Sequence, residues 1–210
     1  PDHCKLVALG KPTEKESKKW FKRYEKHLPN TGEIVFFDRS WYTRALVEAT
    51  MGYCTKRQYT YFMKNVIPWE KKQIEEGVEF FKFYLSIEKN TQQKRIDKRA
   101  TSPLVYWKIS ENDLKMLDKW DAFTLYKEQM FKRTSYDEAP WIVLNANNKK
   151  VAILSALRFI LNAFDYPDKD LPKPKTWSEG LNNYKVEINK VLFENLSYQQ
   201  YKTLRVFADE

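Results

Sequence analysis

The chain has 210 residues, of which 42% are hydrophobic and 31% charged, and its formal net charge is +9. A chain of this length can bury one substantial core, and no apolar run approaches the roughly 20 residues that cross a bilayer. The excess of 37 Lys and Arg over 28 Asp and Glu favours a polyanionic partner such as nucleic acid, anionic membrane or a phosphate polymer, although a solvated basic surface would give the same balance.

Short apolar segments alternate with amphipathic ones along the first 166 residues. The predicted strands are 5–9, 34–37, 78–87 and 141–144, and the predicted helices are 13–27, 40–52, 55–77, 90–99, 110–133 and 149–164. Capping-box spacing marks some helix starts, as at Thr13 with Glu16. The alternation predicts an α/β fold in which helices flank a parallel sheet, and the apolar run 34–37 predicts a strand buried on both faces.

The character of the sequence changes at residue 167. Prolines among charged residues predict an extended connector, and apolar residues then recur at helical spacing from about 184 to 207. We therefore expect a catalytic domain at 1–166, and a connector with a C-terminal helical arm at 167–210.

The 34–37 strand runs directly into Asp38 and Arg39. In open α/β sheets ligands bind at the carboxyl ends of the strands, where a carboxylate can hold Mg²⁺ and a guanidinium can bind phosphate oxygens. A carboxylate near the start of a helix at Ser40 would also be stable without any ligand. Arg44, one turn into that helix, favours phosphate chemistry.

A basic helix and loop follow the third predicted strand. Arg95 and Arg99 are four residues apart and share one helix face, and Trp107 and Lys108 come shortly after. Residues 89–133 are thus typical of a kinase lid that closes over phosphates, with an exposed basic helix of no special use as the alternative.

Residues for other kinds of catalysis are scarce. The two histidines, His3 and His27, form no catalytic arrangement with a serine or cysteine. The two cysteines, Cys4 and Cys54, lack metal-ligand spacing and indicate free thiols, and the first residues do not resemble a secretion signal. We therefore expect a cytoplasmic protein.

Three segments together resemble the second family of polyphosphate kinases, the polyphosphate:nucleotide phosphotransferases of the P-loop kinase type. The resemblance covers residues 4 to about 166 and rests on residues 9–14, on 37–44 followed by Met51 and Gly52, and on 103–110. The second segment is similar to the Walker B motif of the family, which usually has Asn where Thr43 stands. The third is similar to the lid signature, in which Asp commonly precedes the proline where Ser102 stands.

The resemblance implies a three-layer P-loop kinase-like fold with a helical lid, and a nucleotide-binding transferase. It implies reversible, Mg²⁺-assisted phosphoryl transfer between inorganic polyphosphate and a nucleoside di- or monophosphate such as ADP, GDP or AMP. The catalytic residues would be Asp38, which also binds the metal, Arg39, Arg95 and Arg99, and the substrate-binding residues would be Lys11, Arg44, Trp107 and Lys108. Lys11 follows the first strand and would face the same sheet edge as Asp38, or would be a surface lysine.

One family motif is missing. The Walker A loop, Gly-x-x-x-x-Gly-Lys, does not occur, and the 5 glycines are scattered. Its strand lies in the middle of the sheet of a P-loop kinase, so its omission would leave unpaired backbone groups on both sides of a gap. We expect activity to require this segment, supplied as a separate chain or as a further segment.

Two other functions are compatible with the same residues: a non-catalytic polyanion-binding relative, and an ATP-dependent nucleoside monophosphate kinase. The sequence does not choose between diphosphate and monophosphate acceptors, between bases, or between directions of net transfer. A homo-oligomer, dimer or tetramer, is expected from the aromatic helices and the C-terminal arm.

Overall fold

The structure is a computed structural model that describes residues 3–170, 186–188 and 190–195. The chain forms two compact units: Pro1–Glu79 with Ala122–Met130, and Phe80–Asp121 with Phe131–Glu210. Within the described residues, no helix combines the length and the apolar character that crossing a membrane requires.

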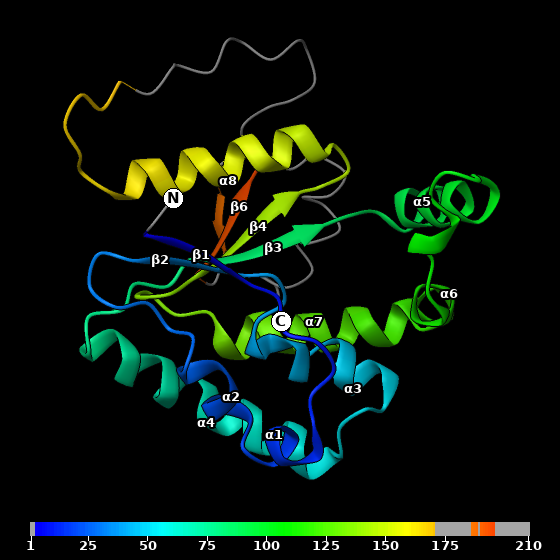
Figure 1. Ribbon diagram of the computed structural model, residues 1–210, viewed down its shortest axis with the longest axis horizontal. Coiled ribbons are helices and arrows are strands. Elements are labelled where there is room, and N and C mark those ends of the chain that lie inside the picture. The colour runs from blue at the N-terminus through cyan, green and yellow to red at the C-terminus, as the bar shows by residue number, and fades with distance from the viewer. Residues whose placement is uncertain (1–2, 171–185, 189, 196–210) are drawn as a thin grey trace. The chain divides into compact units, whose positions relative to one another are not determined.

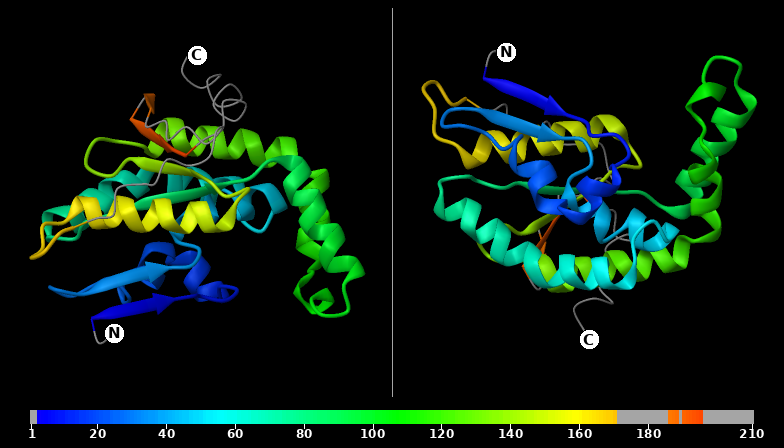
Figure 2. Two further views of the ribbon diagram at one scale, coloured as in Figure 1. Left: turned by 90° about the horizontal axis from the view of Figure 1, so that it is seen from above. Right: turned by 60° about the horizontal axis from the view of Figure 1, so that its bottom comes forward.

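The first unit contains a two-stranded parallel sheet. Strand β1 (Cys4–Val7) pairs with β2 (Ile34–Phe37) in a register that sets Cys4 opposite Ile34 and Val7 opposite Phe37. The two strands run side by side in both views of Figure 2. The helices of this unit are α1 (Glu14–Lys18), α2 (Trp20–Glu25), the 3-10 helix η1 (Trp41–Arg44), α3 (Val47–Met51) and α4 (Lys56–Glu75), most of them labelled in Figure 1.

Local signals in the sequence account for most of these boundaries. The predicted capping box of Thr13 and Glu16 is present, and Thr55 with Gln58 forms another at the start of α4. The helix predicted for 13–27 is divided at Lys19, whose φ of −116° and ψ of 56° are not helical. Each helix therefore starts where a side chain satisfies the free amides of its first turn, or where the backbone changes direction.

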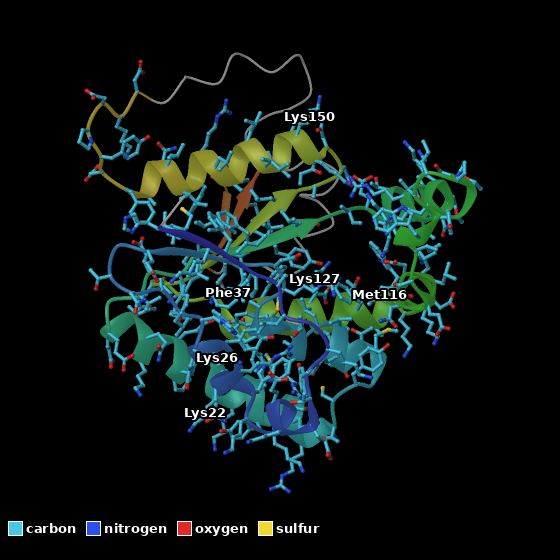
Figure 3. All side chains as sticks on the ribbon, viewed as in Figure 1. Lys22, Lys26, Phe37, Met116, Lys127 and Lys150 are labelled. Carbon is cyan, nitrogen blue, oxygen red and sulfur yellow. The ribbon has the colours of Figure 1, made fainter. Side chains whose placement is uncertain are left out.

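The expectation that β2 is buried on both faces is wrong for the described structure. Ile34 and Phe36 are 42% and 45% exposed, and Leu6, opposite Phe36, is 75% exposed. The other face packs against helices: the ring of Phe37, labelled in Figure 3, lies 6.1 Å from that of Tyr24. An apolar strand can thus look buried in sequence while helices of its unit cover only one of its faces.

The second unit contains a four-stranded sheet in the order β3-β4-β6-β5. Its strands are β3 (Lys82–Ser86), β4 (Trp141–Asn145), β5 (Val186–Ile188) and β6 (Val191–Glu194). The β3–β4 and β4–β6 pairs are parallel, and all five residues of β4 are buried. The helices of this unit are α5 (Lys89–Thr101), the 3-10 helix η2 (Tyr106–Lys108), α6 (Glu111–Asp118) and α8 (Lys149–Ala163), and α7 (Trp120–Thr134) contributes to both units.

Part of the predicted C-terminal arm is β-structure, so the helix expected there is wrong for these residues. Residues 186–188 and 191–194 form an antiparallel hairpin, and Lys190 has the left-handed φ of 66° found in tight turns. The alternation of Val191 and Phe193, both buried, is the strand period that competed with the helical pattern. The rest of the predicted arm lies outside the described residues.

The single sheet expected from the sequence is divided into two among the described residues. β2 is an end strand of the first sheet and β3 an end strand of the second, and within the described part of the chain no strand pairs with their outer edges. The predicted boundary at residues 166 and 167 lies within the second unit. Parallel strands and flanking helices, as predicted, make up both units.

Candidate functional site

Asp38 and Arg39 lie in the loop that directly follows β2. The backbone amide of Asp38 donates to the carbonyl oxygen of Val7 at 2.9 Å, which fixes the loop to the carboxyl end of β1. Both side chains are exposed, and neither has a hydrogen-bond or ion-pair partner among the described residues. Arg39 has a φ of 67°, a left-handed conformation that costs a non-glycine residue about 1 kcal/mol. An exposed carboxylate and an exposed guanidinium thus occupy adjacent positions of a strained turn.

Aromatic side chains of helix α2 hold this loop. The Tyr24 hydroxyl donates to the Ser40 carbonyl at 3.3 Å, and the Trp20 indole donates to the Trp41 carbonyl at 2.9 Å. Ser40 caps η1 as predicted, since its side-chain oxygen accepts from the amide of Tyr42. These bonds restrict where the backbone of Asp38 and Arg39 can go.

Helix α2 also holds the loop of Lys11. Arg23 is 6% exposed and donates from its guanidinium to the carbonyl of Gly10, and Lys11 itself is exposed. Adjacent residues of α2, Arg23 and Tyr24, therefore fix the two loops that carry Lys11 and Asp38. Neither residue was predicted from the sequence, but Arg23 lies at helical spacing from Trp20, on the apolar face where a charge is unexpected.

Arg44 occupies a different environment from Arg39. It is 1% exposed, its Nε lies 3.0 Å from Glu48 Oε2, and its guanidinium lies 3.9 Å from the ring centre of Trp20. Its Nη2 also donates to the carbonyl and hydroxyl oxygens of Ser17 at 3.3 and 3.1 Å. Burial raises the pKa of Glu48, and the charge of Arg44 opposes that rise. The pocket that Arg44 lines includes neither Asp38 nor Arg39.

Two of the predicted lid residues are fixed by contacts within the second unit. Arg95 donates from Nη2 to the carbonyl oxygens of Ala146 and Asn147 at 2.7 and 3.0 Å, in the loop that follows β4. Arg99 Nη1 lies 3.7 Å from Asp113 Oδ2, which links α5 to α6. Both helices extend away from the carboxyl end of β3 in Figure 2.

The other two predicted lid residues are adjacent and exposed. The side chain of Trp107 is 68% exposed, and the ammonium group of Lys108 lies 4.9 Å from its ring centre. A flat ring beside a cation can stack on a nucleobase while the cation binds a phosphate. The predicted residues thus fall in two units: Lys11, Asp38, Arg39 and Arg44 in the first, and Arg95, Arg99, Trp107 and Lys108 in the second.

The donor set for a metal ion is small. The described residues contain no group of three or more His, Cys, Asp or Glu side chains that could hold a metal. Mg²⁺ does not need such a cluster, because it keeps several waters and binds through one or two carboxylates together with substrate phosphates. Asp38, exposed and unpartnered, fits that role as a single protein ligand.

Comparisons with known proteins identify the family. The family described as Polyphosphate kinase 2 matches residues 1–172. The chain belongs to this family. It is 43% identical over 186 residues to a polyphosphate kinase of Corynebacterium glutamicum, covering 86% of this chain and 61% of that protein. It is 44% identical over 171 residues to a GDP-polyphosphate phosphotransferase of Mycolicibacterium smegmatis, covering 81% and 60%.

A solved family structure shares the fold. The crystal structure of polyphosphate kinase 2 from Arthrobacter aurescens matches with a TM-score of 0.73 at 30% identity, covering 82% of this chain and 63% of that one. The α/β fold with parallel strands and flanking helices is therefore the fold of the polyphosphate kinase 2 family. The chain spans about three fifths of the length of the two curated relatives.

Proposed function

We propose that this chain carries much of the catalytic site of a polyphosphate-dependent nucleotide kinase. The reaction is the reversible transfer of a terminal phosphoryl group between inorganic polyphosphate and a nucleoside diphosphate. The observation that carries the proposal is the exposed, unpartnered pair of Asp38 and Arg39 at the carboxyl end of β2, in a chain of the polyphosphate kinase 2 family.

The residues of the first unit act by position and charge. Phosphoryl transfer needs alignment of the phosphates and neutralisation of their charge more than it needs a protein nucleophile. Asp38 would hold Mg²⁺, which when bound neutralises phosphate oxygens and aligns them. Arg39 and Lys11 bind the phosphate chain beside it. Tyr24 and Arg23 keep the two loops in place through Ser40 and Gly10.

The residues of the second unit bind the nucleotide side of the reaction. Arg95 and Arg99 lie on α5, where contacts to the loop after β4 and to Asp113 position their guanidinium groups, and Trp107 with Lys108 offers a stacking surface next to a cation. The name of the Mycolicibacterium smegmatis relative specifies GDP, which favours a diphosphate acceptor for this chain as well. We propose that these four residues close over the acceptor.

We further propose that a strand from outside the described residues pairs with the open edge of β2. The outer edge of β2 has no strand partner in the described part of the chain, and open strand edges pair readily. The strand, Gly-rich loop and helix of a Walker A segment would supply that partner and the main phosphate-binding backbone amides. A cytoplasmic, homo-oligomeric enzyme is part of the same proposal, and light scattering tests the oligomer.

The test is an assay of the chain alone and of the completed chain, meaning the chain joined to the Walker A strand, loop and helix of a relative. Polyphosphate, Mg²⁺ and GDP or ADP are supplied, and triphosphate formation is followed by ³¹P NMR. We expect turnover from the completed chain, loss of turnover in Asp38→Asn, and normal turnover in the matched exposed control Asp165→Asn.

Two results would contradict the proposal. Turnover with ATP and a nucleoside monophosphate, but not with polyphosphate, would indicate an ATP-dependent kinase. Salt-sensitive polyphosphate binding by the completed chain without any transfer would indicate a polyanion-binding protein instead.

A further inference from the structure

The start of helix α5 is bound by a side chain from another element. The N-cap residue of α5 is Glu88, whose own side chain makes no capping bond, and the first turn has no acidic residue. In a capping box, a Glu or Gln at the third helical position accepts from the N-cap amide, and α5 has Thr91 there. The Glu88 amide donates instead to Asn147 Oδ1, at 3.0 Å. A residue of the loop after β4 thus supplies half of a capping box to the first helix of the predicted lid.

Arg95 makes a second connection between α5 and the same loop. Its Nη2 donates to the carbonyl oxygens of Ala146 and Asn147 at 2.7 and 3.0 Å. Asn147 therefore accepts from this helix twice, once through its side chain and once through its backbone. The two contacts lie about two turns apart along α5, so together they restrict both the position and the direction of the helix.

The loop after β4 is itself fixed to the sheet. The amide of Ala146 donates to the carbonyl oxygen of Ser86 at 2.7 Å, which continues the pairing of β4 with β3. The amide of Asn147 donates at 3.0 Å to Oδ1 of Asn145, which is 8% exposed. Asn147 is therefore attached to the sheet on one side and to α5 on the other.

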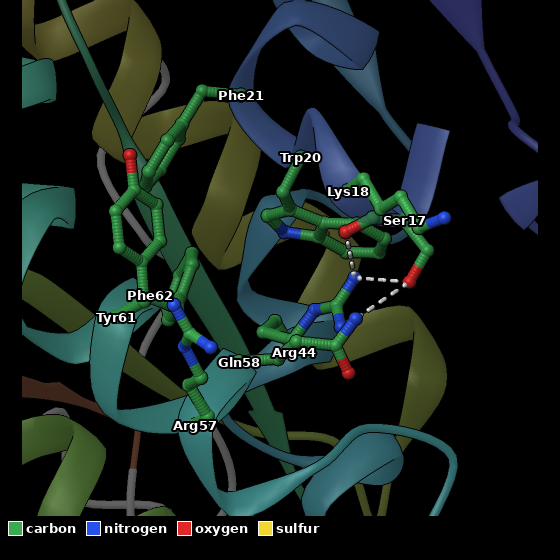
Figure 4. A pocket seen from close by; sticks show the side chains of 9 residues that line it. All are labelled: Ser17, Lys18, Trp20, Phe21, Arg44, Arg57, Gln58, Tyr61 and Phe62. Carbon is green, nitrogen blue, oxygen red and sulfur yellow. Dashed lines mark hydrogen bonds between the residues drawn. The ribbon is translucent and has the colours of Figure 1, made fainter. Parts of the chain in front are cut away.

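The guanidinium of Arg95 keeps donors for a ligand while it binds the loop. Nη2 donates to the two carbonyl oxygens, whereas Nε and Nη1 have no partner among the described residues, and the side chain is only partly buried. Arg44 is different: Figure 4 shows its guanidinium between the ring of Trp20 and the side chain of Ser17, and it is 1% exposed. Because a guanidinium is planar and rigid, fixing one nitrogen of Arg95 sets the direction of the other two.

We propose that Asn147 is a positioning residue, which sets the direction of α5 and, through it, of the Arg95 guanidinium. Its contribution to catalysis rests on the proposed function, in which Arg95 closes over the acceptor nucleotide. Asn147 itself touches no substrate, but it keeps the free nitrogens of Arg95 in the orientation that the acceptor phosphates require. Without its side chain, the start of α5 loses its contact with the sheet and the guanidinium is held by backbone carbonyls alone.

Amide hydrogen exchange of the chain tests this contact without any turnover. Asn147→Ala removes the side-chain acceptor, so exchange of the Glu88 amide should accelerate by about fivefold, as expected for the loss of one hydrogen bond. Asn147→Asp keeps an oxygen at the same position, so the acceleration should stay within about twofold. Asn148→Ala is the matched control, because its side chain accepts from Lys150 and Val151 in α8 and makes no hydrogen bond to the described helix α5. It should leave exchange of the Glu88 amide unchanged.

Kinetics of the completed chain test the link to the reaction. Asn147→Ala should lower kcat/KM for the nucleoside diphosphate by about threefold to tenfold, and Asn147→Asp should restore most of it. In an Arg95→Gln background, Asn147→Ala should have little further effect, because a residue that acts through Arg95 loses its influence when Arg95 is replaced. Asn148→Ala should lower the melting temperature, because α8 loses its cap, and change kcat/KM by less than about twofold.

Unchanged exchange of the Glu88 amide in Asn147→Ala, or unchanged kcat/KM, would overturn the proposal. Additive losses in Asn147→Ala and Arg95→Gln would overturn it too, as would equal losses of kcat/KM in Asn147→Ala and Asn148→Ala, because they would indicate a general loss of packing. Failure of the proposed function would give a different result. The unmodified completed chain would then show no turnover, and exchange of the Glu88 amide would still decide whether Asn147 holds α5.

Discussion

Two charged pairs of the first unit lie close in sequence but differ in their exposure and in their partners. Asp38 and Arg39 are exposed and have no partner among the described residues, and the backbone of Arg39 is left-handed. Arg44 and Glu48 are buried, and Arg44 Nε lies 3.0 Å from Glu48 Oε2. The exposed pair is available to a metal ion and to phosphates. The buried pair joins η1 to α3 and, through Ser17, to α1. The charge of a residue alone does not decide between these uses; its surroundings do.

Removing the exposed carboxylate should have the largest effect of all on activity. Asp38→Asn keeps the shape but loses the charge that we propose holds Mg²⁺, so the turnover of the completed chain should fall by at least about 100-fold. Because the side chain has no partner, the urea midpoint should stay within experimental error. Turnover within about threefold of the unmodified chain would remove Asp38 from the site.

Removing the buried carboxylate should have the largest effect on stability. Glu48→Gln leaves the charge of Arg44 uncompensated at 1% exposure, which should lower the free energy of unfolding by about 3–5 kcal/mol. The measurement is urea unfolding, with exposed Glu14→Gln as the matched control. A loss below about 1 kcal/mol would mean that the pair does not hold the unit together.

The strained turn gives a third comparison, in which activity and stability move in opposite directions. Arg39→Gly removes the cost of a φ of 67° and should raise the free energy of unfolding by about 0.5–1 kcal/mol, while turnover should fall because the proposed phosphate contact is lost. Arg39→Ala loses the same contact but keeps the strain. Equal stability of the two variants would show that this turn stores no strain.

Removing the ion pair of Lys5 and Glu33, in the same unit, should have the smallest effect on stability. The hydrogen bond from Lys5 at 2.6 Å, followed by the amide of Asn30, lowers the pKa of Glu33 to about 2. A carboxyl that is more acidic in the folded state stabilises it above the unfolded pKa, near 4.5, and this contribution is lost as the pH falls towards 2.

Unfolding measured between pH 6 and pH 2.5 should therefore show a shallower acid dependence in Glu33→Gln than in the unmodified chain. An unaltered pH dependence would show that solvent screens the Lys5–Glu33 pair completely, in contrast to the buried Arg44–Glu48 pair.

Sequence patterns predicted the elements best where the signal is local. The capping box at Thr13, the cap at Ser40 and the strand that ends at Phe37 depend on neighbouring residues and were confirmed. The hairpin at 186–194 was missed because its pairing with β4 joins residues far apart in sequence, and helical spacing described the same apolar residues equally well. Long-range pairing decides such cases.

The site residues also divide into those that local sequence predicts and those that depend on long-range packing. Strand-end position was enough to predict that Asp38 and Arg39 lie at the carboxyl end of a strand. It could not show that Arg44 faces Trp20 and Glu48, because that depends on how α2 and α3 pack around it. Arg23 and Tyr24 were missed for the same reason, since their partners are backbone carbonyls of distant loops.

The most direct test measures turnover and the free energy of unfolding on the same preparations of Asp38→Asn and Glu48→Gln in the completed chain. We predict that Asp38→Asn loses turnover and keeps its stability, and that Glu48→Gln loses stability while the molecules that remain folded still transfer phosphate. Equal losses of both properties in both variants would contradict the assignment of the exposed pair to catalysis and of the buried pair to structure.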